Sequence, residues 1–225
     1  MQVSGLRAIS LALRTARSNQ NPIQTPTKTW PTLDAESGFE VQRITAEDAI
    51  SSGDRLAGYK LGNIAKVMQD AFGLDHPDYG FLLASTFVNE GTSLYRKQYI
   101  KPSVELEPAF VVRGPLRGPN CTVADIINAT DYAIPVIETI GSPDNGSSSS
   151  VILGSTPRKL TELTLRDIRG TLRFNDWEVM SGNTANILGN PLSGTACCLE
   201  ALPMEEARHW TCTFESWGTI EFDVV

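Results

Sequence analysis

The stretch Val104-Glu105-Leu106-Glu107-Pro108-Ala109-Phe110-Val111-Val112 reads as a mostly apolar β-strand that carries two carboxylates. Side chains at positions i and i+2 of a strand leave the same face, so Glu105 and Glu107 should point in one direction. Two neighbouring buried carboxylates repel each other, and the pair is unfavourable unless a positive group offsets it. A hard cation such as Mg²⁺ or Mn²⁺ prefers oxygen ligands and would do so. The alternative is an edge strand with a solvated acidic face.

A third acid, Glu138, lies in the apolar run 134–140, which predicts another strand. Around these strands the hydrophobic spacing predicts an α+β protein. Residues 19–36 read as a loop or linker, and Thr45 is expected to cap the start of a helix. Further helices are expected at 1–18, 63–72, 122–129 and 191–202. Strands are expected at 58–62, 81–88, 99–112, 133–140, 151–154, 172–179, 210–214 and 219–225, the last two as a terminal hairpin.

The composition is that of an ordinary globular protein. Of 225 residues, 41% are hydrophobic and 20% are charged, with a formal net charge of −7. No basic patch stands out, so neither nucleic acid nor an anionic membrane surface is an expected partner. No apolar run approaches the roughly 18 residues that a membrane span needs.

The N-terminal segment is basic, as many targeting signals are. Its apolar stretch is interrupted by Arg7, so a secretory signal is not expected. The composition of residues 1–18 is compatible with a transit peptide. Leu6, Ile9 and Leu13 fall at helical spacing, however, and favour a plain amphipathic helix.

The cysteines and histidines restrict redox chemistry and zinc binding. Cys121, Cys197, Cys198 and Cys212 form no CxxC pair, which favours reduced thiols in an intracellular, cytoplasmic protein. Only two histidines occur, which argues against a zinc site built on histidines.

Lys60 lies in the segment 58–62, among apolar and glycine residues. In a core strand, burial would disfavour the charged amine and lower its pKa, which would make the lysine an acid/base near neutral pH. The alternative is a sheet-edge lysine with its ammonium group in water. Asp78 follows a proline in the turn cluster 75–80, where aspartates mostly make local hydrogen bonds. Arg117 offers a group that could bind a carboxylate.

Five motifs occur together in one order and spacing. They are GYKLG (58–62), HPDYG (76–80), VELEPAF (104–110), PLRGPNCT (115–122) and ATDYAIPVIE (129–138). In this pattern the chain resembles the hydratase/decarboxylase branch of the fumarylacetoacetate hydrolase superfamily. The resemblance is dense from residue 38 to residue 140 and continues more weakly to the terminal strand.

The resemblance implies one Mg²⁺ or Mn²⁺ ion, held by three glutamates. Glu105, Glu107 and Glu138 occupy those positions here. The metal of the family binds the 2-oxo and carboxylate groups of a pyruvoyl-like substrate, and a Lewis acid there stabilises the developing enolate.

The resemblance also implies an acid/base pair and a substrate-binding segment. Lys60 matches the acid/base lysine of the family and Asp78 matches its partner. Leu61 and Gly62 stand where the substrate is bound. The expected partner is therefore a small 2-oxo or 2-hydroxy acid, and family members are commonly homo-oligomers.

The fold implied by the resemblance is α+β, with a mixed β-roll or sandwich core of the fumarylacetoacetate hydrolase C-terminal type. Residues 1–55 would form a helical N-terminal region. Residues 56–225 would form the catalytic domain, shortened after residue 140 and after residue 202. Two local departures accompany this shortening: Asn-Ile-Ala at 63–65 replaces the usual Leu-Thr-Ser, and Ser103 replaces an arginine.

The resulting functional hypothesis is a divalent-metal-dependent lyase. It would hydrate a 2-hydroxy-dienoate or 2-oxo-alkenoate of the 2-oxo-hept-4-ene-1,7-dioate or 2-hydroxypentadienoate type. One alternative is a 2-oxo acid decarboxylase of the 4-oxalocrotonate type, or a C–C hydrolase of the same superfamily. Another alternative is a catalytically silent or truncated homologue, which the altered and missing segments favour.

Overall fold

The computed structural model describes residues 2–64, 69–70, 73–141, 148–194, 199 and 201–225, whose strands form three sheets. The largest sheet has the order β3 (Phe87–Asn89), β6 (Ser148–Leu153), β5 (Thr130–Ile140), β4 (Ser103–Val112), β9 (Leu202–Pro203). The second has the order β11 (Gly218–Val224), β10 (Arg208–Phe214), β7 (Arg169–Phe174), β8 (Trp177–Asn183). The third pairs β1 (Leu56–Gly62) with β2 (Asp78–Leu83). The expected mixture of helices with parallel and antiparallel strand pairs is confirmed.

Strand β4 separates two faces of the large sheet by the alternation of its side chains. Leu106 is fully buried and belongs to one apolar cluster with Trp210 and Phe214 of the second sheet. Glu105 and Glu107 leave the opposite face, as expected from the two-residue period. Glu107 is only 7% exposed, so the alternative of a solvated acidic face is wrong.

The glutamate face is covered in part by the segment that includes β2 and β3. Leu82 and Phe87 pack there against Val136 of β5 and Val151 of β6. Because Val136 lies directly opposite Glu107 in the register, this small apolar cluster borders the carboxylates. The third sheet, β1–β2, therefore lies on the face of the large sheet that carries the charges.

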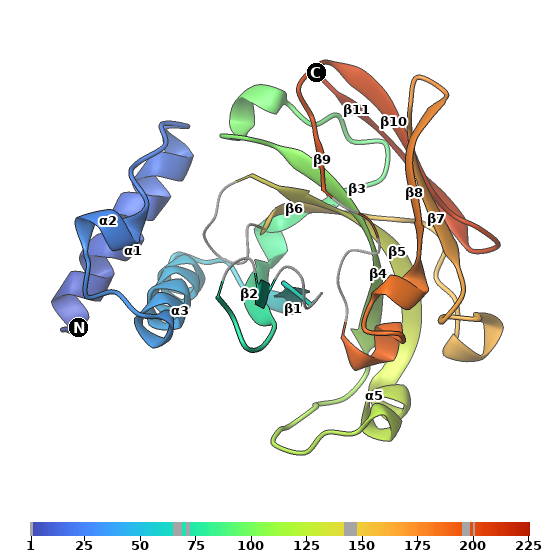
Figure 1. Ribbon diagram of the computed structural model, residues 1–225, viewed down its shortest axis with the longest axis horizontal. Helices are drawn as coiled ribbons and strands as arrows, with labels where there is room; N and C mark the ends of the chain where they lie inside the picture. Colours follow the sequence, from blue (N-terminus) through green and yellow to red (C-terminus); the bar gives the residue numbers. More distant parts are fainter. Residues whose placement is uncertain (1, 65–68, 71–72, 142–147, 195–198, 200) are drawn as a thin grey trace.

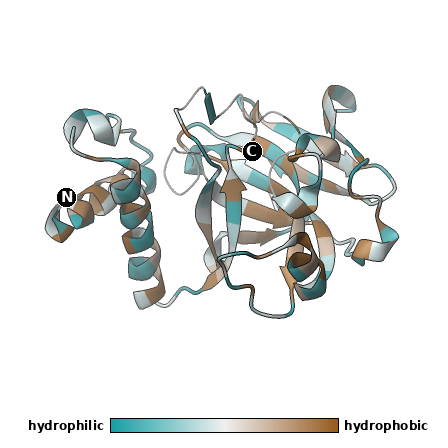
Figure 2. Cartoon of the chain, turned by 60° about the horizontal axis from the view of Figure 1, so that its bottom comes forward, coloured by the Kyte–Doolittle hydropathy of each residue, from teal (hydrophilic) through white to brown (hydrophobic). Residues whose placement is uncertain are grey.

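The N-terminal region consists of helices α1 (Val3–Ser18), α2 (Pro26–Thr29) and α3 (Ala35–Ser51), which lie to one side of the sheets (Figure 1). Leu6 and Ile9 of α1 pack against Val41 and Ile44 of α3, which confirms the amphipathic first helix. Figure 2 shows hydrophobic and hydrophilic residues alternating along these helices. Within the described part of the chain, no helix is long and apolar enough to cross a membrane.

Helix α3 begins earlier than the sequence pattern predicts. Asp34 is its N-cap and accepts a hydrogen bond from the Ser37 backbone N–H at 2.8 Å. Thr45 lies inside the helix, where its hydroxyl donates to the Val41 carbonyl at 2.9 Å and contacts Ser10. The expected start at Thr45 is therefore wrong, because a threonine hydroxyl can bond the preceding turn instead of capping.

The C-terminal half is mostly hairpins. The expected terminal hairpin is confirmed as β10–β11, and Asn175 and Asp176 make the β7–β8 turn with positive φ. The helix expected at 191–202 is wrong where the structure describes it: Pro191–Ser193 is a 3₁₀ turn and Leu202–Pro203 is strand.

Some predictions fall outside the described residues. Most of the helix expected at 63–72 does, as do Cys197 and Cys198. The other two cysteines are free thiols, with Cys121 exposed and Cys212 buried. The expected helix at 122–129 is confirmed as α5 (Val123–Ala129), with the capping box of Thr122 and Asp125 in place.

Candidate metal and acid–base site

Three glutamates from two adjacent strands come together on the charged face of the large sheet. Glu105 of β4 lies directly opposite Glu138 of β5, and Glu107 lies two residues further along β4 on the same face. One carboxylate oxygen from each residue lies within 4.8 Å of the others. Glu138 is 1% and Glu107 is 7% exposed, whereas Glu105 is only partly buried.

The electrostatics of this cluster are unfavourable by themselves. Burial, with a smaller contribution from the negative charge of Glu138, raises the pKa of Glu105 to about 7, although the nearby Lys60 acts in the opposite direction. The same causes, with burial the largest, raise the pKa of Glu107 well above its usual range. Three ionised carboxylates in this space therefore require additional positive charge.

The donor set fits a hard divalent cation. All three residues offer carboxylate oxygens, which Mg²⁺ and Mn²⁺ prefer. Oε1 of Glu138 is buried and has no hydrogen-bond partner among the described residues. A buried anionic oxygen without a donor is costly, and a cation at this position would satisfy it.

Lys60 of β1 reaches the cluster from the third sheet. Its side chain is 7% exposed and its Nζ lies 2.9 Å from Oε2 of Glu138. Burial lowers the pKa of the Lys60 ammonium, but the charges of Glu138, Glu107 and Glu105 together outweigh burial and raise it. The predicted lowering of its pKa is therefore wrong for the protein without a cation, and so is the solvated alternative. Neutralisation of the glutamates by a cation would remove the effect that raises this pKa.

Asp78, the first residue of β2, lies directly opposite Gly62 of β1. Because Lys60 and Gly62 are two residues apart on β1, Asp78 projects from the same face of the hairpin as Lys60. A Cβ atom added to Gly62 would lie 2.2 Å from Oδ1 of Asp78, so the carboxyl group occupies the space above this glycine. Glycine is therefore the residue that this close approach allows.

Asn63 contacts Asp78, and the sequence analysis did not predict this contact. Its Nδ2 donates a hydrogen bond to Oδ2 of Asp78 at 3.1 Å. Oδ1 of Asp78 is buried and has no hydrogen-bond partner among the described residues. The signal that could have pointed to Asn63 is its position directly after Gly62, since asparagine tolerates the left-handed backbone that tight turns use.

Leu61 and Gly62 relate to the site through the main chain. The side chain of Leu61 alternates away from the Lys60 face and packs against the main apolar core. Gly62 has no side chain to offer. A substrate contact by either residue would therefore involve backbone groups.

Aromatic contacts hold the β1–β2 hairpin against helix α3. Phe39 stacks on Tyr79 with ring centroids 4.9 Å apart, and Phe81 contacts Tyr79 and Tyr59 edge-on or tilted. Gln42 also donates to the Tyr79 carbonyl at 2.8 Å. These contacts position the strand pair that carries Lys60 and Asp78.

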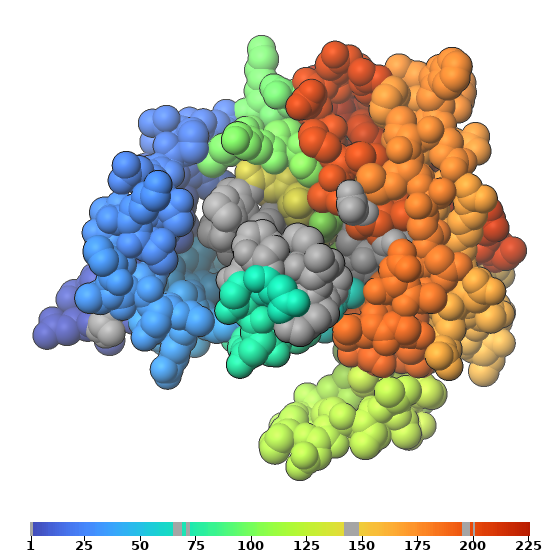
Figure 3. Space-filling view, viewed as in Figure 1, coloured from blue at the N-terminus to red at the C-terminus, as the bar shows by residue number. Residues whose placement is uncertain are grey.

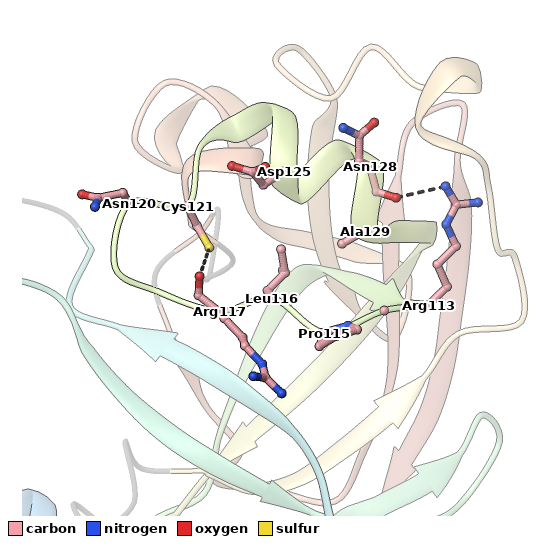
Figure 4. A pocket seen from close by; sticks show the side chains of 10 residues that line it. Arg113, Pro115, Leu116, Arg117, Asn120, Cys121, Asp125, Asn128 and Ala129 are labelled. Carbon is pink, nitrogen blue, oxygen red and sulfur yellow. Dashed lines mark hydrogen bonds between the residues drawn. The ribbon is translucent and has the colours of Figure 1, made fainter.

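Arg117 lies at a groove whose lining residues include none of the three glutamates. This open groove has a volume of about 630 Å³ and is formed by residues of the 113–129 segment (Figure 4). Figure 3 shows this segment standing out from the body of the molecule. The groove begins at Arg113, directly after the end of β4 and six residues beyond Glu107. The suggested carboxylate-binding role of Arg117 stays a prediction.

Comparison with known proteins gives both sequence and structural relatives. No family model matches the chain. The chain is 34% identical over 207 residues to 2-oxo-hept-4-ene-1,7-dioate hydratase of Escherichia coli, an alignment that covers 84% of this chain and 78% of the relative.

Two solved structures share the fold. 4-Oxalocrotonate decarboxylase from Pseudomonas putida G7, complexed with magnesium and adipate, superposes with a TM-score of 0.95 at 24% identity over 100% of this chain and 99% of that chain. A fumarylacetoacetate hydrolase from Exiguobacterium antarcticum gives a TM-score of 0.57 at 12% identity over 75% and 74%.

The identity to the Escherichia coli hydratase shows the family, and the two solved structures show the same fold. The chain belongs to the hydratase/decarboxylase family, and it is an enzyme of that type. The family expected from the five sequence motifs is thereby confirmed.

Proposed function

We propose that the protein is a divalent-metal-dependent hydro-lyase that hydrates a 2-hydroxy-dienoate or 2-oxo-alkenoate. The observation that carries this proposal is the group of Glu105, Glu107 and Glu138 with Lys60 at 2.9 Å from Glu138. The identity to a relative named a hydratase supports a substrate of the 2-oxo-hept-4-ene-1,7-dioate or 2-hydroxypentadienoate type.

We propose Glu105, Glu107 and Glu138 as the ligands of one Mg²⁺ or Mn²⁺ ion. Their oxygen donors, burial and mutual repulsion all support a hard cation. The ion would act as a Lewis acid that stabilises the negative charge of an enolate developing on a 2-oxo acid. The magnesium bound by the structural relative agrees with this choice.

The proton transfers are assigned to Lys60 and Asp78. Ketonisation of the dienol moves the 2-hydroxyl proton to carbon, and hydration then adds OH to the conjugated carbon and H to C3. Nζ of Lys60 is buried beside the carboxylates and would take and return these protons. Oδ1 of Asp78 lies on the same face of the hairpin and would accept a proton from the attacking water.

The substrate contact is assigned to the backbone of Leu61 and Gly62, which follow Lys60 directly. The carboxyl group of Asp78 lies directly above Gly62, so a substrate bound to the Gly62 backbone would also contact Asp78. The partner is a small 2-oxo or 2-hydroxy acid. Four further features stay predictions. They are the division into a helical region 1–55 and a catalytic domain 56–225 shortened after residues 140 and 202, the β-roll or sandwich core, the homo-oligomeric assembly and the cytoplasmic location.

Decarboxylation is the second candidate function. It is favoured by the TM-score of 0.95 to a 4-oxalocrotonate decarboxylase over the whole chain. The same metal and proton-transfer groups would serve both reactions, because each passes through an enolate at the same carbon.

The products of the reaction decide between these functions. Purified protein with Mg²⁺ is mixed with the dienol substrate, the loss of dienol absorbance is followed, and the products are read by NMR. Hydration gives a 4-hydroxy-2-oxo acid, whereas a decarboxylase acting on a 4-oxalocrotonate-type substrate releases CO₂. Acid fragments would indicate a C–C hydrolase. No change in absorbance with any of these substrates would contradict the proposed function and indicate a silent homologue.

A further inference from the structure

The turn after β1 holds one oxygen of the Asp78 carboxyl group by a hydrogen bond. Asn63 donates its carboxamide hydrogen to Oδ2 at 3.1 Å. Oδ1 lies above Gly62, two residues from Lys60, with no hydrogen-bond partner among the described residues. A carboxylate held by one oxygen has a defined direction in which the second oxygen points.

The backbone of Asn63 is itself held in place. Its φ of 50° lies in the left-handed region, which asparagine adopts more readily than most residues with a side chain. The buried amide of Gln69 donates to the Asn63 carbonyl oxygen at 2.9 Å. The turn therefore places the carboxamide of Asn63 beside Asp78, the first residue of β2.

We propose that Asn63 is a positioning residue for Asp78, an inference that rests on the proposed function. Its hydrogen bond to Oδ2 orients the carboxyl group so that Oδ1 faces the space shared with Lys60. Asn63 stands at a position where the resemblance to the family predicts leucine, which cannot donate a hydrogen bond. The contact is thus a feature of this chain's own sequence.

The alternative explanation is that Asn63 only forms the turn and does not position Asp78. Two variants distinguish these explanations. Asn63→Gly keeps the left-handed turn, since glycine adopts positive φ at no steric cost, but removes the donor. Asn63→Asp keeps the shape of the side chain and replaces the donor by a carboxylate that repels Asp78. Asn120→Gly is the matched control, because Asn120 also has positive φ, at 75°, but lies in the exposed loop before α5.

The proposal predicts a loss in kcat with KM preserved. Asn63→Gly should lower kcat about tenfold with KM within about twofold, the size expected for one hydrogen bond to a charged group. Asn63→Asp should lower kcat further, and Asn120→Gly should match the wild type. In an Asp78→Asn background, Asn63→Gly should have less than about a twofold effect, because residues that act through one another are not additive. Wild-type kcat in Asn63→Gly, or a full tenfold loss in the Asp78→Asn background, would overturn the proposal.

A second readout does not depend on activity. Crystal structures of the wild type and of Asn63→Gly should show the Asp78 carboxyl group leaving its position above Gly62 in the variant. An unmoved carboxyl group would overturn the positioning role. If the wild-type protein turns over no 2-oxo-alkenoate, the proposed function fails and this structural comparison alone decides the role of Asn63. If Asn63→Gly does not fold, the same comparison is made with Asn63→Asp.

Discussion

The large sheet has two buried faces with opposite chemistry. On one, Leu106 is fully buried among apolar side chains of the second sheet. On the other, Glu107 and Glu138 are nearly as buried, beside Lys60. Burial of apolar groups stabilises a fold, whereas burial of like charges destabilises it. The comparison favours the proposal that the charged face binds a cation, whereas the apolar face provides the stability.

The largest effect is expected from removal of one charge of the acidic face. Glu107→Gln should lower the metal-dependent activity by roughly a hundredfold or more, since even partners of metal ligands are worth 10–100-fold. Its free energy of unfolding in EDTA should be unchanged or higher, because the buried repulsion is relieved. Turnover with Mg²⁺ and urea unfolding in EDTA measure the two quantities. Full activity would remove Glu107 from the metal site.

The neighbouring residue on the other face should behave in the reverse way. Leu106→Ala should lower the free energy of unfolding by about 2–5 kcal/mol, because it leaves a cavity in the core. Mn²⁺ binding per folded chain should stay close to that of the wild type. Urea unfolding and metal titration below the transition check both, and a stability change under about 1 kcal/mol would break the contrast between the faces.

A pair of glycines in β1 tests the space above the hairpin. Gly62→Ala should reduce activity about tenfold with a small stability change, because the new Cβ would lie 2.2 Å from Oδ1 of Asp78 and the carboxyl group must move. Gly58→Ala is the matched control on the same face, since its Cβ would meet Leu82 at an ordinary 3.8 Å. Equal kcat values in both variants would show that the position of Asp78 does not matter.

The smallest effect is a pH dependence of stability in the absence of metal. The pKa of Glu105 is raised from an ordinary 4.5 to about 7, so the native state binds more protons than the unfolded state between these values. The free energy of unfolding should therefore fall as pH rises through this range. Added Mg²⁺ should stabilise more at the high end, because its ligands must be deprotonated. Stability in EDTA that rises from pH 4.5 to 7 would contradict this environment for Glu105.

Local patterns in the sequence were sufficient for some of these features. The alternation of the 104–112 strand alone predicts that Glu105 and Glu107 share a face, and the structure agrees. The position of Glu138 beside them depends on the register of two strands about 30 residues apart, which no local period specifies. Only the family motifs pointed to it.

Other features depend on contacts that a single sequence does not display. The pKa of Lys60 follows from three carboxylates on other strands, so burial alone gave the wrong direction. The start of α3 was missed because Thr45 and Asp34 are both good caps by type, and packing against α1 selects the longer helix. The hydrogen bond of Asn63 depends on a single left-handed residue.

The central claim is that Glu105, Glu107 and Glu138 hold one divalent cation to which a 2-oxo acid binds. An electron paramagnetic resonance titration with Mn²⁺, with and without oxalate as a substrate mimic, tests it most directly. The account predicts one bound ion per chain, a spectrum that changes when oxalate is added, and loss of binding in Glu107→Gln. A spectrum of free Mn²⁺ alone at every concentration up to about 1 mM would contradict the claim. A dissociation constant of about 1 mM corresponds to a binding free energy of only about −4 kcal/mol.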